Sequence, residues 1–126
     1  MIVKHTQEMV ASPMDKPGFS GMDARFVLTA DDGCPRYALR LMEWKPGGHT
    51  AYHRHKEEHE MFVIEGEAVA VGEGKKEAKL VAGDALYLAP CELHQIRNAG
   101  SGRLRMICTV PIFPGKDGRT TSPCED

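Results

Sequence analysis

The sequence has no apolar stretch approaching the roughly 18–20 residues that a membrane-spanning helix needs. Its first ten residues, MIVKHTQEMV, also lack the apolar core of a secretory signal peptide. These two absences predict a cytoplasmic protein with no membrane partner. A chain of 126 residues with 41% hydrophobic residues is long enough to bury one core, which predicts a single domain.

An excess of positive charge is also absent, because the net charge is -2 at pH 7. This balance argues against a strongly basic surface and therefore against a nucleic-acid partner. No pair of cysteines has CxxC spacing, so we expect reduced thiols rather than disulfides. The four cysteines are Cys34, Cys91, Cys108 and Cys124.

Convincing helical periodicity is missing as well. Instead, 13 glycines and 8 prolines separate short apolar segments at fairly even spacing, which favours an all-β sandwich or barrel. We expect a segment over 1–24 that contributes a terminal strand near 2–6, a barrel over 25–113 and a mobile polar tail over 114–126. The expected strands cover 25–29, 36–44, 50–55, 59–65, 68–71, 78–81, 85–88, 94–97 and 103–110, with a turn at 46–48.

Four of the six histidines fall between residues 49 and 59. On a strand, His53 and His55 would point to the same face, and a short charged corner would let His59 return to the same space. His94 follows a turn and can close the site from a third strand. Isolated histidines are mostly solvated or hydrogen-bonded, but this spaced set of four predicts a metal site with open coordination positions.

Two motifs around these histidines resemble those of the cupin superfamily. The first runs from Gly47 through the three histidines to Gly66, and the second runs from Gly83 through His94 to Asn98. This resemblance implies a single-domain antiparallel barrel of jelly-roll type, commonly a homodimer with exchanged N-terminal strands. The family usually places a glutamate where this sequence has His59. The pattern is therefore similar to a subgroup of small cupins with four histidine ligands, His53, His55, His59 and His94, often manganese-bound.

Imidazole ligands alone suit zinc, copper, iron or nickel. The subgroup resemblance is the reason to place manganese or iron first. Met106, Cys108 and Val110 share one strand face and are candidate walls for a small organic substrate. Arg40 either faces that pocket, where it could bind a carboxylate or enolate oxygen, or is solvated, depending on which face of its strand points inward.

Three functions fit this pattern. The first is a metal-dependent oxygenase, for example a dioxygenase, in which oxygen or a bidentate substrate takes the open positions. The second is a metal-dependent isomerase or lyase of a sugar or keto acid, which needs a further group for proton transfer. The third is a non-enzymatic module that binds a small ligand. The sequence leaves open whether the protein is an enzyme.

Overall fold

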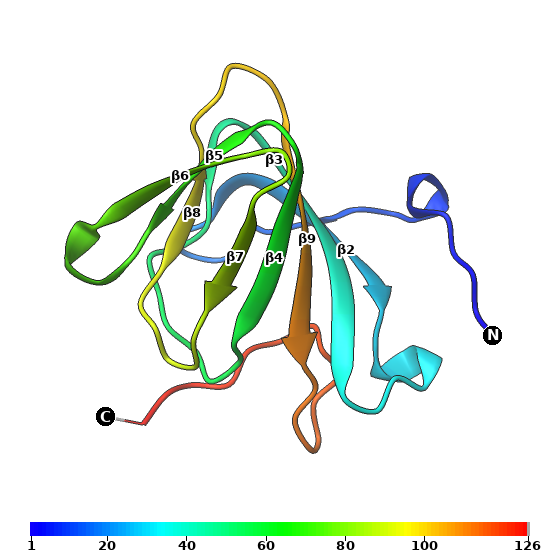
Figure 1. Ribbon diagram of the computed structural model, residues 1–126. Coiled ribbons are helices and arrows are strands. Elements are labelled where there is room, and N and C mark those ends of the chain that lie inside the picture. The colour runs from blue at the N-terminus through cyan, green and yellow to red at the C-terminus, as the bar shows by residue number, and fades with distance from the viewer. Residues whose placement is uncertain (126) are drawn as a thin grey trace.

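Short extended segments separated by turns form almost the whole fold, as the spacing of glycine and proline predicts. The computed structural model describes residues 1–125, in which nine strands are joined by loops and three single-turn 3₁₀ helices (Figure 1). The helices are η1 (Thr6–Glu8), η2 (Ala30–Asp32) and η3 (Glu73–Lys75). The strands are β1 (Ser12–Pro13), β2 (Ser20–Leu28), β3 (Tyr37–His49), β4 (His59–Glu65), β5 (Glu67–Val71), β6 (Glu77–Val81), β7 (Ala85–Leu88), β8 (Gln95–Asn98) and β9 (Leu104–Pro111).

All strand pairs are antiparallel and belong to one sheet with the order β6-β5-β8-β3-β9-β4-β7. Strand β2 lies outside this order: it also pairs with β3, and β1 pairs with β2. The sheet curls so that its two ends enclose a common interior (Figure 1). The predicted all-β, single-domain barrel of antiparallel strands is therefore confirmed. None of the helices in residues 1–125 is long and apolar enough to cross a membrane.

The side chains of β3 and β9 show which face of the sheet lines the interior. Arg40 and Met42 point inward and are buried, whereas Tyr37 is 64% exposed. On the neighbouring strand β9, Cys108 pairs with Arg40 and Met106 with Met42. The predicted wall residues thus share the interior face. The interior is completed by Met22, Ala24, Ala38, Trp44, Met61, Val63, Ala68, Ala70, Leu80, Leu88, Ile96, Leu104 and Val110.

Several predicted boundaries were wrong. The segment 46–48, expected to be a turn, lies inside the bent strand β3, where Gly47 has a φ of 79°. The segment 50–55, expected to be a strand, makes only an isolated bridge between His53 and His94. Thr50 instead bonds to the backbone of Ile96, which ends the regular pairing of β3 with β8.

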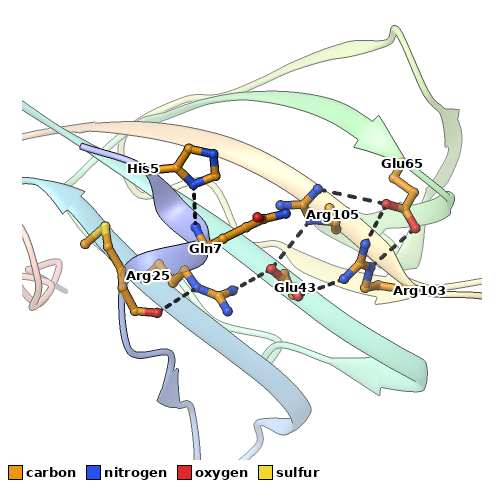
Figure 2. A network of polar contacts seen from close by, with 8 residues as sticks. His5, Gln7, Arg25, Glu43, Glu65, Arg103 and Arg105 are labelled. Carbon is orange, nitrogen blue, oxygen red and sulfur yellow. Dashed lines mark hydrogen bonds and ion pairs between the residues drawn. The ribbon is translucent and has the colours of Figure 1, made fainter. Parts of the chain in front are cut away.

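The outer face beside β2, β3, β4 and β9 carries a network of ion pairs, centred on Glu43 and Glu65 (Figure 2). Arg25 and Arg105 bind Glu43 from the strands on either side of β3, and Arg103 reaches both carboxylates. Partly exposed surface ion pairs of this kind contribute about 1 kcal/mol or less each. Burial of the apolar interior therefore contributes most of the stability of the barrel.

The N-terminal segment is not the strand predicted near 2–6. Residues Thr6–Glu8 form a 3₁₀ turn, and Lys4 is held by the carbonyl of Val27 and the carboxylate of Asp32. Figure 1 shows this segment projecting away from the barrel. The first strand of the barrel, β2, begins at Ser20, before the predicted boundary at residue 25. Exchange of this segment between two subunits stays a prediction.

The C-terminal segment crosses one end of the barrel (Figure 1). Arg119 binds Asp31, and Ser122 donates hydrogen bonds from its backbone and its hydroxyl to the buried carboxylate of Glu57. The backbone N–H of Lys56 donates to the carbonyl of Ser122. These contacts tie the predicted tail to the corner that carries the histidines.

The expectation of four reduced thiols was wrong. Cys91 and Cys124 form a disulfide, while Cys34 and Cys108 are free. The two bonded cysteines are 33 residues apart and are brought together only because the C-terminal segment folds back onto the turn before His94. Cysteine spacing in the sequence cannot reveal a pairing of this kind.

Replacement of Gly66 by alanine should lower the free energy of unfolding by roughly 3 kcal/mol or more. Gly66 has a φ of 92°, and an added Cβ would lie 2.4 Å from the carbonyl oxygen of Arg103. Gly74 provides a matched control, because its φ of 66° is also positive but no atom lies within 4 Å of an added Cβ. Urea unfolding of G66A and G74A measures the difference. Equal stability of the two variants would contradict the steric argument.

Candidate metal centre

Three histidines converge at one end of the barrel interior. His53 and His55 lie on the extended segment between β3 and β4, and His94 directly precedes β8. Two backbone hydrogen bonds join His53 and His94 across the bridge. One ring nitrogen from each of the three residues lies within 4.8 Å of the others, a spacing that could hold a metal ion. The structure therefore supports a cluster of three histidines.

His59, the first residue of β4, lies beside this cluster. Its ring centroid is 4.7 Å from that of His55 and 5.3 Å from that of His94, and its Nε2 is 3.0 Å from Nε2 of His55. It does not belong to the group of three whose ligand atoms all lie within 4.8 Å. The predicted set of four is thus supported for three members, and a fourth ligand from His59 stays a prediction.

Backbone carbonyls orient two of the rings. Nδ1 of His55 lies 2.8 Å from the carbonyl oxygen of Glu57, and Nδ1 of His94 lies 2.7 Å from that of Glu92. A carbonyl oxygen can only accept, so each Nδ1 carries the proton and donates it. Nε2 of each ring is left with a lone pair, which is the form that binds a metal ion.

The surroundings of His59 differ. Its Nδ1 is 2.9 Å from the sulfur of Cys108 and 3.3 Å from Nη2 of Arg40. Because arginine only donates, the contact with Arg40 favours a proton on Nε2 of His59, which can then donate to Nε2 of His55. With the proton on Nδ1, that nitrogen would donate to the sulfur instead and Nε2 would be free to bind metal. The environment of His59 thus allows both tautomers.

Burial keeps the histidines of the cluster neutral. Burial is the largest cause that lowers the pKa of His53 and of His55 to about 4, and repulsion from His94 adds to it. The pKa of His59 lies well below its usual value, and that of His94 is also lowered, again mainly through burial. At pH 7 these imidazoles are therefore unprotonated and available as ligands.

These shifts predict that the metal-free protein loses stability in mild acid. Above a pH of about 6.5 the histidines are neutral in both the folded and the unfolded chain. As the pH falls to 5, the unfolded chain binds protons at His55 while the folded chain, with a pKa of about 4 there, does not, so His55 alone lowers the free energy of unfolding by about 1.5 kcal/mol; the lowered pKa values of His59 and His94 act in the same direction. His53 is only half-buried and contributes less. Urea unfolding at pH 6.5 and at pH 5 should show that the free energy of unfolding falls by at least about 2 kcal/mol. The fall should be smaller in H55A. A free energy of unfolding that does not change with pH would contradict the lowered pKa values.

A cavity of about 60 Å³ adjoins the cluster, with His53, His59 and His94 in its lining. Arg40 also lines it, so the question left open by the sequence is answered: this side chain faces the interior. The predicted wall residues Met106, Cys108 and Val110 are buried in the core and do not line the cavity. The remaining lining residues are Met14, Phe19, Met22, Met42, Trp44, Thr50, Met61, Leu88, Ile96, Arg119 and Thr121.

Two lining residues come from the C-terminal segment, and no sequence pattern predicts them. Arg119 and Thr121 reach the cavity although the region after residue 113 shows no periodicity. Glu57 is a further residue that the sequence does not identify, since it lies in the short charged corner before His59 but is only 3% exposed. Its burial depends on Ser122, 65 residues further along the chain.

Residues 40–110 match the profile of the Cupin domain. The chain belongs to this family. The matched residues include the three clustered histidines and His59, together with Arg40 and Cys108, so the family match covers the whole predicted site. No curated protein sequence matches the chain significantly.

Solved cupin-like structures support the same fold. The polyketide cyclase RemF from Streptomyces resistomycificus superposes with a TM-score of 0.84 at 23% identity, over 100% of this chain and 87% of that one. A predicted oxalate decarboxylase from Thermotoga maritima gives 0.79 at 22% identity, over 89% of this chain and 100% of that one. Ectoine synthase from P. lautus gives 0.70 at 24% identity, over 88% and 78%. At these identities the likeness shows the fold alone.

Proposed function

We propose that this cupin is a metal-dependent enzyme of the oxygenase type that acts on a small organic substrate. The observation that carries the proposal is the convergence of His53, His55 and His94 beside a cavity with mainly apolar walls. An apolar cavity next to a metal site holds the organic part of a substrate and excludes water. When bound, a redox-active ion would supply the electron-transfer and Lewis-acid chemistry for the reaction, with dioxygen as the oxidant.

The donor set fits a divalent ion. Nε2 of His55 and of His94 carry lone pairs, and no carboxylate belongs to the group of ligand atoms in residues 1–125. We include His59 as a fourth ligand in the proposal. Two nitrogens that bind one ion at right angles and about 2.1 Å lie about 3.0 Å apart, and the Nε2 atoms of His55 and His59 are separated by 3.0 Å. Manganese or iron is preferred because of the resemblance to four-histidine cupins; zinc, nickel and copper also accept imidazole.

Oxygen consumption tests this proposal. Protein loaded with iron or manganese is mixed with small phenols, diketones and alkenes in an oxygen electrode, and products are analysed with ¹⁸O₂. Incorporation of ¹⁸O that depends on the metal and disappears in H94A supports the oxygenase. If the same substrate is consumed at the same rate without oxygen, the reaction is not oxidative.

A second candidate is a metal-dependent isomerase or lyase of a sugar or keto acid. Solved structures with this fold include a polyketide cyclase, a predicted oxalate decarboxylase and an ectoine synthase, and these names are the reason to keep this candidate. The cavity offers little for proton transfer, because no aspartate, glutamate or lysine lines it within residues 1–125. This candidate therefore ranks second. A non-enzymatic binding module ranks third, and it would bind its ligand equally well after loss of His94.

We further propose a homodimer in which N-terminal segments are exchanged. The exposed apolar side chains of Ile2 and Val3 support this proposal, since a partner subunit would cover them. Sedimentation of the full chain and of a variant lacking residues 1–11 tests it.

A cytoplasmic location stays a prediction. The Cys91–Cys124 disulfide argues against it, because cytosolic proteins rarely keep disulfides.

A further inference from the structure

Arg40 is a buried cation without an anionic partner. Its side chain is only 5% exposed, and none of the ion pairs in residues 1–125 includes it. Its Nη2 contacts the sulfur of Cys108 and Nδ1 of His59. Its Nε is buried and has no hydrogen-bond partner. A guanidinium cannot lose its proton to escape this cost, so its burial calls for an anion.

The cavity beside Arg40 contains no group that could serve as that anion. Its lining holds a second cation, Arg119, and no aspartate or glutamate within the described residues. Glu57 is buried near the histidines, but its carboxylate accepts both hydrogen bonds of Ser122 and lies 3.8 Å from Nδ1 of His55. Any metal ion held by the histidines would add further positive charge. No carboxylate of the described residues pairs with Arg40, so a ligand in the cavity would supply the missing negative charge.

We propose that Arg40 binds the carboxylate of a small organic anion in this cavity. Nη1 is the group left to bind a carboxylate oxygen, because no described residue gives it a hydrogen-bond partner, Nη2 already contacts Cys108 and His59, and Nε is fully buried. A cavity of about 60 Å³ accommodates an anion of a few non-hydrogen atoms. The inference rests on the proposed function only where it treats the anion as the substrate. Binding by Arg40 itself needs no metal.

Calorimetric titration of metal-free protein with acetate, pyruvate and oxalate tests the inference, with acetamide and pyruvamide as uncharged probes of similar shape. We expect at least one carboxylate to bind about tenfold or more tightly than its amide, since hydrogen bonds to a charged partner give that discrimination. R40M should lose this preference, whereas R40K should keep part of it. R36M is the matched control, because Arg36 is exposed just before β3 and should leave binding unchanged.

Thermal unfolding separates a binding role from a structural one. Without ligand, R40M should unfold at a higher temperature than the wild type, because it replaces an unpaired buried charge by an apolar side chain of similar length. Added carboxylate should stabilise the wild type but not R40M. Equal affinity for carboxylate and amide, or unchanged carboxylate binding in R40M, would overturn the inference.

A metal titration of the same protein, beside the carboxylate titrations, distinguishes failure of this inference from failure of the proposed function. If the protein binds metal through its histidines but shows no preference for carboxylates, the inference fails and the metal-dependent function stands. If metal does not bind but Arg40 still selects carboxylates, the inference stands and the metal-dependent function fails.

Discussion

Replacing His55 by alanine should weaken metal binding by at least roughly 100-fold. His55 is buried, its Nδ1 donates to the carbonyl of Glu57, and its Nε2 faces the centre of the cluster. Loss of the side chain therefore removes a ligand whose orientation is already fixed. Loss of groups that merely orient a metal ligand costs about 10–100-fold in affinity, so loss of the ligand itself should cost more.

Competition with a chromogenic chelator measures this affinity for manganese, iron and zinc. His49 provides the control, because it lies on β3 outside the cluster and its Nδ1 contacts the carbonyl of Thr50. H49A should bind metal as the wild type does. Comparing the metal affinities of H59A and H94A then shows how much His59, the proposed fourth ligand, contributes relative to His94, a member of the cluster. Unchanged affinity in H55A would remove this residue from the site.

Reduction of the Cys91–Cys124 disulfide should lower the free energy of unfolding by about 3–4 kcal/mol. The bond closes a loop of 33 residues, and the chain-entropy account of crosslinks gives a value in this range. Release of Cys124 also frees the segment that carries Ser122, which supplies both hydrogen bonds to the buried carboxylate of Glu57. The lower free energy of unfolding therefore has two causes. The unfolded chain gains conformational freedom, and the native contact of Ser122 with Glu57 weakens.

Urea unfolding with and without dithiothreitol measures the effect. C124S should have the stability of the reduced wild type and should not respond to dithiothreitol. C34S is the control, because Cys34 is a free thiol and its loss should leave the response to reductant intact. Thiol counting on the denatured, unreduced protein should find two free cysteines. Four free thiols, or equal stability in both redox states, would contradict the disulfide.

The histidine centre was largely predictable because its signal is local. His53 and His55 are two residues apart in extended chain, and His94 follows a turn that returns it to the same end of the barrel. His59 illustrates the limit of spacing arguments. Its position in the sequence predicts a ligand, but its contacts with Cys108 and Arg40 depend on strand pairing across the barrel.

The orientation of Arg40 could not be read from periodicity. On β3 the outward-facing Leu41 is also buried, at 4% exposure, between the inward-facing Arg40 and Met42. Apolar residues therefore occur on both faces, and alternation does not identify the interior. The C-terminal segment was unpredictable for a different reason: Arg119, Ser122 and Cys124 reach their partners by long-range contacts that leave no periodic pattern.

The most direct test of the metal centre is the metal content of protein purified from its native cells without chelators. Elemental analysis should find about one manganese or iron ion per chain, and X-ray absorption should find imidazole nitrogens at about 2.0–2.2 Å. The triple variant with alanine at His53, His55 and His94 should contain no bound metal. A wild-type metal content no higher than that of the triple variant would contradict the central claim.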